Sequence, residues 1–290
     1  MENFANSSFF LEKRAPTLPA PAEVRSLNAK TGHKKALDRN WPPPVAIPSL
    51  GLVVKYGTQV FIDEMHVQMM IREKLLGQVH VPEVFGWTQD QGQVFIYMAL
   101  VEDADPLHER WADMSEKERL SVCAELRQAA QAWRTVEPEE GGRYIESIRK
   151  QPLSDIFFNS RPDLGQKKGP FEGTNAAQKF HDACYIEISP VQTPSASDIV
   201  FTHNDLVACN ILVTKGPNPK LAAVIDWAQA GWYPGYWEYC KSRYIDVPDD
   251  KQFTEALQEE WRQRYLPLIL NQVGDKECYY PWLRFALSMI

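Results

Sequence analysis

The 290-residue sequence lacks long apolar runs and paired cysteines. No uncharged apolar stretch approaches the roughly 18–20 residues that a membrane helix needs, so we expect no membrane contact. The short apolar run at residues 9–11 follows no basic residue, so it does not predict a secretory signal peptide. The five cysteines form no Cys-x-x-Cys pair, which argues against zinc ribbons and redox motifs. We therefore expect a soluble, cytoplasmic chain with reduced thiols.

An excess of basic residues is also missing. The 38 acidic residues outnumber the 31 lysines and arginines, and the formal net charge is -7. Because nucleic-acid-binding proteins usually present a basic face, we expect no nucleic-acid partner. The acidic balance mildly favours cationic ligands. Hydrophobic residues make up 44% of the chain, which is enough for a real core and excludes wholesale disorder.

Residues 1–50 hold seven of the 21 prolines. Proline lacks a donor N–H and interrupts regular ladders, so we expect an extended arm or a mostly irregular segment there. Beyond it, hydrophobic periodicity predicts a strand, a helix and a hairpin of two strands. These elements are expected at residues 52–56, 61–76, 84–87 and 94–98. Residues 51–100 are therefore predicted to form a small β-rich lobe, with residues 1–50 as its arm and start.

The rest of the chain, residues 101–290, is predicted to form a larger and mainly helical lobe. Ser115, followed three residues later by Glu118, is a capping-box pattern that predicts the start of a helix. Three strands are expected further on, at residues 199–202, 211–213 and 221–225. A loop rich in polar side chains separates the first two strands, and Asp226 ends the third.

Three of these polar residues carry a chemical pattern. Asp205 lies five residues before Asn210, and the following hairpin delivers Asp226. Magnesium takes hard oxygen ligands and few of them from protein, because phosphates and water complete its octahedron. Asn210 and Asp226 supply such ligands, which leaves Asp205 to accept the proton of a substrate hydroxyl, as in phosphoryl transfer. The alternative is that all three are ordinary turn and capping residues.

Lys55 and Glu64 extend this pattern upstream. Lys55 lies on the predicted strand, and Glu64 follows nine residues later on the predicted helix. A lysine that neutralises phosphate oxygens needs a carboxylate to hold it, and this spacing fits that geometry. The alternatives are a solvated strand lysine and one more surface carboxylate beside Asp63.

Two segments resemble a known superfamily. Residues 201–213 contain His203-Asn204-Asp205 and Asn210, and residues 224–239 contain Ile225-Asp226-Trp227 and an aromatic run. Both are similar to the aminoglycoside phosphotransferase and choline kinase superfamily, more narrowly to its fungal branch. With Val53-Val54-Lys55-Tyr56-Gly57, the similarity covers most of residues 50–245. It implies a bilobal α+β fold like that of protein kinases, with ATP bound between the lobes.

The resemblance also implies roles for individual residues. Asp205 would be the catalytic base, with Asn210 and Asp226 on Mg2+ and His203 bracing the loop. The aromatic run beyond Asp226 is interpreted as core rather than as a cage for a quaternary amine.

On the nucleotide side, Lys55 would contact phosphates while pairing with Glu64. The segment from Met98 to Leu100, where the last small-lobe strand gives way to the linker, would contact adenine.

The sequence departs from the family pattern in places. No convincing glycine-rich phosphate loop precedes Lys55, and Ala228 stands where the fungal branch usually has glutamate. The region after residue 245, where this superfamily builds its substrate sites, matches least.

The favoured function is an ATP-dependent small-molecule phosphotransferase that transfers the γ-phosphate to a hydroxyl of a polar or cationic acceptor. The alternative is a catalytically weak or inactive kinase-like module that binds nucleotide or protein. A protein kinase is less favoured, because Trp227 replaces the usual Phe-Gly after Asp226 and no Ala-Pro-Glu follows closely.

Overall fold

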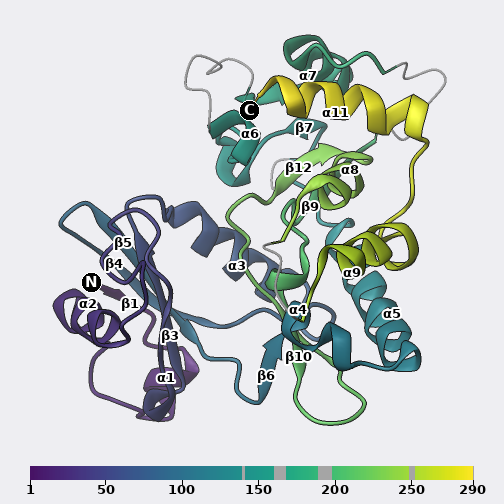
Figure 1. Ribbon diagram of the computed structural model, residues 1–290. Coiled ribbons are helices and arrows are strands. Elements are labelled where there is room, and N and C mark those ends of the chain that lie inside the picture. Colours follow the sequence, from purple (N-terminus) through teal and green to yellow (C-terminus); the bar gives the residue numbers. More distant parts are fainter. Residues whose placement is uncertain (139–140, 160–167, 189–197, 248–251, 290) are drawn as a thin grey trace.

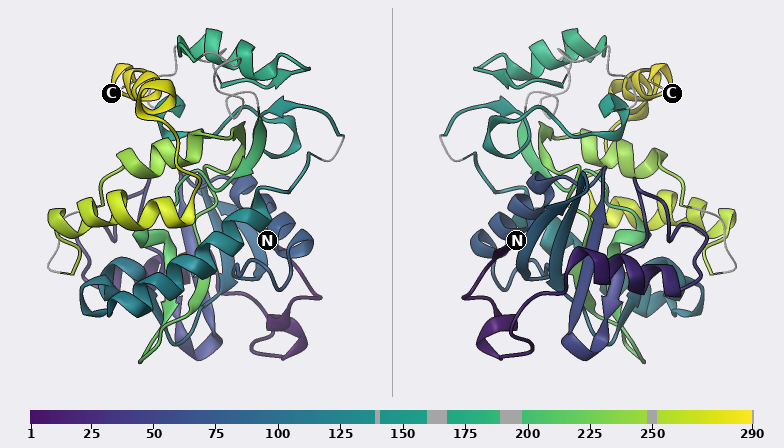
Figure 2. Two further views of the ribbon diagram at one scale, coloured as in Figure 1. Left: turned by 90° about the vertical axis from the view of Figure 1, so that its right-hand side faces the viewer. Right: turned by 90° about the vertical axis from the view of Figure 1, so that its left-hand side faces the viewer.

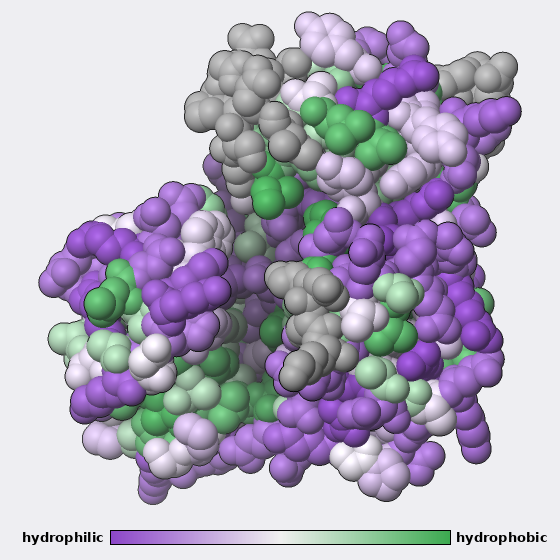
Figure 3. Space-filling model, in the orientation of Figure 1, coloured by the Kyte–Doolittle hydropathy of each residue, from purple (hydrophilic) through white to green (hydrophobic). Residues whose placement is uncertain are grey.

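The computed structural model describes residues 1–138, 141–159, 168–188, 198–247 and 252–289. The chain forms two lobes, a β-rich N-terminal lobe and a larger C-terminal lobe with most of the helices (Figure 1). The predicted α+β, bilobal fold class is confirmed. A hollow lies between the two lobes on the face that Figure 3 shows in the orientation of Figure 1.

The N-terminal lobe is built on a five-stranded antiparallel sheet of order β1-β4-β5-β3-β2. Its strands are β1 (Glu2–Asn3), β2 (Val45–Ile47), β3 (Leu52–Gly57), β4 (Val84–Asp90) and β5 (Gln93–Ala99). The predicted strands are present, but β4 and β5 extend further than expected. Only Gln91 and Gly92 connect them, and both have positive φ angles, as a tight hairpin turn requires.

The first fifty residues are more regular than expected. They contain α1 (Ser8–Leu11), α2 (Pro21–Lys30) and the 3-10 turn η1 (Pro48–Leu50) as well as β1 and β2. Proline does not prevent a helix from starting in this segment, because Pro21 occupies the first turn of α2, where its missing N–H removes no helix hydrogen bond. Phe9 and Val24 are fully buried in one cluster with Phe95 of the sheet, so this segment is part of the lobe core.

Helix α3 (Ile62–Lys74) belongs to both lobes. Met65 packs in a cluster with residues of β4 and β5, whereas Val67, Met70 and Ile71 belong to the large core of the C-terminal lobe. Figure 1 accordingly shows α3 running from the sheet toward the other lobe. The side chains of α3 therefore couple the position of this helix to both halves of the cleft.

The C-terminal lobe begins with β6 (Ala104–Pro106), α4 (Leu107–Arg110), η2 (Trp111–Asp113) and α5 (Glu116–Trp133). The predicted capping box at the start of α5 is confirmed: Ser115 Oγ accepts from the Glu118 N–H, and Glu118 accepts from the Ser115 N–H. Strand β10 (Ile211–Thr214) pairs with β11 (Leu221–Val224) and β6, and β9 (Ile199–Thr202) pairs with β12 (Gly231–Pro234). The strands expected at 199–202, 211–213 and 221–225 are thus present.

The remaining described elements surround these strands (Figures 1 and 2). They are β7 (Tyr144–Ile145), η3 (Ile148–Lys150), α6 (Ile156–Asn159), β8 (Phe171–Glu172), α7 (Ala176–Cys184), η6 (Ala208–Asn210), α8 (Trp237–Tyr244), α9 (Glu255–Glu260), η7 (Trp261–Tyr265), α10 (Leu266–Ile269), η8 (Asp275–Tyr279) and α11 (Tyr280–Ser288). All five cysteines are free. Among the helices in the described ranges, none combines the length and apolar character that crossing a bilayer requires.

The aromatic run after Asp226 is core, as expected. Each of its six members is at most 3% exposed: Trp227, Trp232, Tyr233, Tyr236, Trp237 and Tyr239. Their rings pack against one another and against α11, for example Trp237 on Trp282 at a centroid distance of 5.9 Å. The run therefore anchors α8 and the strands that flank the polar loop, and leaves no open aromatic cage for a cation.

Candidate active site

The polar loop between β9 and β10 carries Asp205 at its centre. Asn204 adopts a left-handed conformation with a φ of 63°, a backbone state that asparagine tolerates better than most residues. This local reversal breaks the extended path of β9 and lets the chain enter η6, which ends at Asn210. The loop thus places two side chains five residues apart in direct contact.

Asn210 holds Asp205 in place. Its Nδ2 donates to the Asp205 backbone carbonyl at 2.9 Å and to the Asp205 Oδ2 at 3.0 Å. Burial raises the pKa of Asp205, an effect that the positive charge of Lys241 opposes and the negative charge of Asp226 reinforces. Asp205 is thereby a fixed carboxylate with raised basicity, which suits a proton acceptor.

Asp226 follows β11 and faces the N-terminal lobe. Its φ of 64° is left-handed, so the chain turns sharply at this residue. Lys55 Nζ of β3 donates to Asp226 Oδ1 at 2.9 Å and to Glu64 Oε1 of α3 at 2.7 Å. One lysine therefore joins a strand of the N-terminal lobe, the shared helix and the C-terminal lobe.

The three charges shift one another's ionisation. Burial alone would lower the pKa of Lys55, but Glu64 and Asp226 outweigh it and raise that pKa well above its usual value. Burial would raise the pKa of Asp226, yet Lys55 holds it below the ordinary value. Glu64 is almost completely buried, and this raises its pKa to about 7 even beside Lys55. Lys55 and Asp226 consequently stay charged near neutral pH.

His203 lies behind the loop rather than in the cleft. Its ring nitrogens contact the Ile225 carbonyl at 2.9 Å and the Asp205 N–H at 3.2 Å, and its ring meets Trp227 at 4.4 Å. Burial lowers its pKa, so the imidazole is neutral and accepts from Asp205 while donating to Ile225. This geometry ties the Asp205 loop to the chain just before Asp226.

The segment expected to contact adenine lies where β5 leaves the sheet. Met98 is buried, and its sulfur accepts from Gln68 Nε2 of α3 at 3.3 Å. The Leu100 N–H donates to the Gly51 carbonyl at 2.9 Å, so this amide already has a partner. A nucleotide base at this segment would have to use other groups than the Leu100 N–H.

The connection before Lys55 is short. Strands β2 and β3 are joined by η1 and Gly51, whose φ of 54° is left-handed. At the other end of β3, a Cβ on Gly57 would lie 2.2 Å from the Asn40 carbonyl, so the preceding chain covers that end tightly. Within residues 1–57, all of which are described, no glycine-rich turn between two strands precedes Lys55, in agreement with the sequence.

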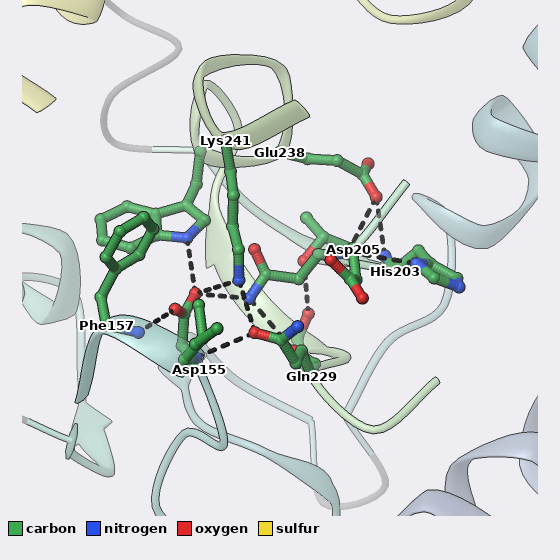
Figure 4. A network of polar contacts seen from close by, with 12 residues as sticks. Asp155, Phe157, His203, Asp205, Gln229, Glu238 and Lys241 are labelled. Atoms are coloured by element: carbon green, nitrogen blue, oxygen red, sulfur yellow. Dashed lines mark hydrogen bonds and ion pairs between the residues drawn. The ribbon is translucent and has the colours of Figure 1, made fainter. Parts of the chain in front are cut away.

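Glu238 supports the loop that carries Asp205, a role that the sequence did not predict. Glu238 Oε1 of α8 accepts from the backbone N–H groups of His203 at 2.8 Å and Asn204 at 3.2 Å (Figure 4). Its other oxygen accepts from Trp133 Nε1 at 3.4 Å and lies 3.8 Å from Arg134. A fully buried carboxylate thus fixes the start of the loop that carries Asp205. In the sequence, Glu238 stands between two aromatic residues, Trp237 and Tyr239.

The side chains fit a magnesium ion. Because Asn210 Nδ2 points at Asp205, its Oδ1 remains to bind a metal, and Asp226 offers a carboxylate that is 37% exposed to the cleft. Hard oxygen donors of this kind suit Mg2+, which takes its other ligands from phosphates and water. Across the described ranges, no group of three or more His, Cys, Asp or Glu residues is arranged around a metal position.

Most of the chain matches a known protein family. Residues 60–270 match the model of the phosphotransferase enzyme family, so the chain belongs to that family. No curated protein matches the sequence.

Solved structures share the fold at low identity. The ternary complex of APH(2")-IIa with streptomycin and ATP has a TM-score of 0.54 and 16% identity, and covers 94% of this chain and 90% of that chain. Aminoglycoside-3'-phosphotransferase of type VIII has a TM-score of 0.48 and 13% identity, covering 82% and 85%. A thermostable mutant of APH(4)-Ia with AMP-PNP and hygromycin B has a TM-score of 0.45 and 15% identity, covering 82% and 76%.

Proposed function

We propose that the protein is an ATP-dependent kinase that phosphorylates a hydroxyl group of a polar or cationic small molecule. The observation that carries this proposal is the pairing of Lys55 with both Glu64 and Asp226, opposite an Asp205 held by Asn210. Membership of the phosphotransferase family and the fold shared with a streptomycin–ATP complex support it. Both halves of a phosphoryl-transfer site face one cleft.

Each side chain then has a task. As the oxygen of the acceptor hydroxyl attacks the γ-phosphorus of ATP, the bond to the β-phosphate breaks, ADP leaves and Asp205 accepts the hydroxyl proton. Lys55 neutralises phosphate oxygens, and Glu64 keeps it pointed into the cleft. Asn210 and Asp226 would hold Mg2+, which neutralises the charge of the phosphates when bound. His203 and Glu238 contribute by fixing the loop, not by transferring protons.

The test is calorimetric titration with a non-hydrolysable ATP analogue, with and without Mg2+, on the wild type and on Asp226→Ala. Magnesium-dependent binding that disappears in the variant is the expected result, and acceptor alcohols and amino sugars are then screened. Asp113→Ala, an exposed aspartate on η2, serves as the matched control and should bind like the wild type. Absence of nucleotide binding under every condition would refute the proposal.

The rival function is a kinase-like module with weak or no turnover. It is favoured by the short β2–β3 connection, which offers no glycine-rich loop to wrap phosphates, and by Ala228 beside Asp226. Against it stands the complete catalytic loop. Nucleotide binding without any ATP consumption, with every acceptor tried, would favour this module over the kinase.

A further inference from the structure

Below the catalytic loop lies a buried ion pair that the proposed reaction does not use. Lys241 Nζ of α8 is 2.9 Å from Asp155 Oδ2, and the two side chains are 1% and 0% exposed. Replacing a buried ion pair by apolar side chains is often neutral or stabilising, so such a pair is weak evidence for a stability role. Its partners show what else it does.

Both carboxylate oxygens of Asp155 accept hydrogen bonds. Its Oδ2 accepts from Lys241, from Asn204 Nδ2 at 2.7 Å and from Trp237 Nε1 at 3.2 Å, while its Oδ1 accepts from the Phe157 N–H at 2.9 Å. Of these donors, Asn204 lies in the catalytic loop, directly before Asp205. Its left-handed backbone sets the direction in which Asp205 leaves the loop.

Lys241 also reaches the segment that follows Asp226. Its Nζ donates to Gln229 Oε1 at 2.7 Å, and the Gln229 carbonyl accepts from Asn204 Nδ2 at 3.1 Å. Figure 4 shows Lys241 descending from α8 onto Asp155 and Gln229, while Glu238 from the same helix reaches the other side of the loop. Two residues spaced by three on α8 thus hold the same loop, one by its backbone and one through a side chain.

We propose that Lys241 and Asp155 are positioning residues for phosphoryl transfer: the pair fixes Asn204 and Gln229, and thereby the placement of Asp205 relative to Asp226. This inference rests on the proposed function for its catalytic consequence. A displacement of a reacting group by about 1 Å can lower a rate by roughly a hundredfold, so a fixed loop has a large effect on turnover. Nucleotide affinity, by contrast, depends on Lys55 and the metal ligands and should be little affected.

The test compares Lys241→Met and Lys241→Arg with the wild type. Lys220→Met, which removes an exposed lysine paired with Glu125, is the control for loss of a charge. Hydrogen exchange of the backbone amides of residues 203–210 is measured first, because it needs no acceptor. Calorimetry with the ATP analogue and Mg2+ follows, and then kcat and KM with ATP.

Lys241→Met should accelerate exchange at residues 203–210 and leave the β3–β5 sheet unchanged. Its kcat should fall roughly tenfold to a hundredfold, with nucleotide affinity within about twofold of the wild type. Lys241→Arg, whose guanidinium can still donate to Asp155 and Gln229, should recover most of kcat. Unchanged exchange at 203–210, or a faster exchange spread evenly over the chain, would overturn the proposal.

A second variant covers the case in which Lys241→Met does not fold, since it leaves Asp155 buried and unpaired. Asp155→Asn combined with Lys241→Met removes both charges, while the amide oxygen can still accept from Asn204 Nδ2 and Trp237 Nε1, so the fold should be retained. Loss of loop protection in this stable variant supports positioning, and retained protection contradicts it. If the wild type consumes no ATP, the kinase proposal fails alone, because the exchange measurement still decides whether the pair fixes the loop.

Discussion

The two lobes supply opposite walls of one cleft, and they support their polar groups differently. In the C-terminal lobe, Asp205 sits on a loop whose backbone and side chains are held by Glu238, Asp155 and His203, all buried. In the N-terminal lobe, Lys55 depends on one carboxylate of α3 and on Asp226 across the cleft.

Under the proposed function, the C-terminal wall serves the proton-transfer step and the N-terminal wall serves nucleotide binding. A wall whose loop is held by several buried hydrogen bonds keeps its geometry without a ligand. The N-terminal wall has the charge for phosphates but no glycine-rich loop to enclose them. We infer that the protein is better prepared for the proton-transfer step than for tight nucleotide binding.

The sharpest way to test the C-terminal wall is Asp205→Asn. The variant keeps the shape of the side chain but removes the proton acceptor, so ATP-dependent phosphorylation should fall by roughly 10²–10⁴-fold. Calorimetry should still detect magnesium-dependent binding of the ATP analogue. Turnover equal to that of the wild type would exclude Asp205 as the base, and Asp113→Asn provides the matched surface control.

On the N-terminal wall, Lys55→Met should act mainly on binding. It removes the cation that faces the phosphates and leaves Glu64 buried without its partner. A hydrogen bond to a charged group contributes about 1.5–3 kcal/mol, so the Kd of the ATP analogue should rise roughly tenfold to a hundredfold. An unchanged Kd, measured by calorimetry beside Lys220→Met, would remove Lys55 from the nucleotide site.

A contact between the walls predicts a smaller effect. Arg149 of η3, itself at a left-handed φ of 61°, contacts His66 Nε2 of α3 at 3.1 Å. Arg149→Ala loosens the helix that carries Glu64, and loss of one hydrogen bond of about 0.5–1.5 kcal/mol should weaken nucleotide binding by roughly two- to tenfold. Arg127→Ala, on the exposed face of α5, is the control. Equal affinities for both variants would show that the two walls hold without this contact.

The smallest predicted effect concerns the pH dependence of stability in the C-terminal lobe. Burial lowers the pKa of His181 on α7 from an ordinary value of 6.5 to about 4. The neutral form is therefore favoured by folding, and its contribution to stability is present above pH 6.5 and is lost as the pH falls toward 4.

His181→Gln should reduce this acid sensitivity. Urea unfolding at pH 8 and pH 5 should show a smaller loss of unfolding free energy for the variant than for the wild type. Because Gln can still hydrogen-bond the Tyr236 hydroxyl, which lies 2.9 Å from His181 Nε2, the comparison isolates the titration. Equal losses in both proteins would contradict the assignment.

The residue pattern predicted much of the fold, because local signals and tertiary packing agree in most elements. The capping box of Ser115 and Glu118 and the strand predicted around Lys55 each gave the right element. In the first fifty residues, the high proline content did not by itself predict α2. At the first turn of α2, proline instead favours a helix start.

Only part of the candidate site could be predicted from the sequence. Asp205 and Asn210 lie five residues apart and Asp226 ends the following hairpin, so the sequence by itself predicted that they converge. Glu238 and Asp155 contact Asn204 of the loop from 34 and 49 residues away in the sequence, Lys241 contacts Asp155 from 86 residues away, and no local pattern marks pairs of that kind. Their role became visible only with the coordinates.

The sequence by itself determined the family-type loop around Asp205, the pairing of Lys55 with Glu64, and the lack of a glycine-rich turn before Lys55. These features depend on residue type and on spacing along the chain. Only the tertiary structure decided how the cleft is braced: that α3 belongs to two cores, that one lysine joins both lobes, and that α8 holds the catalytic loop from two sides. The physical reason is that buried polar groups must find partners wherever the chain brings them, and those partners are chosen by packing rather than by proximity in sequence.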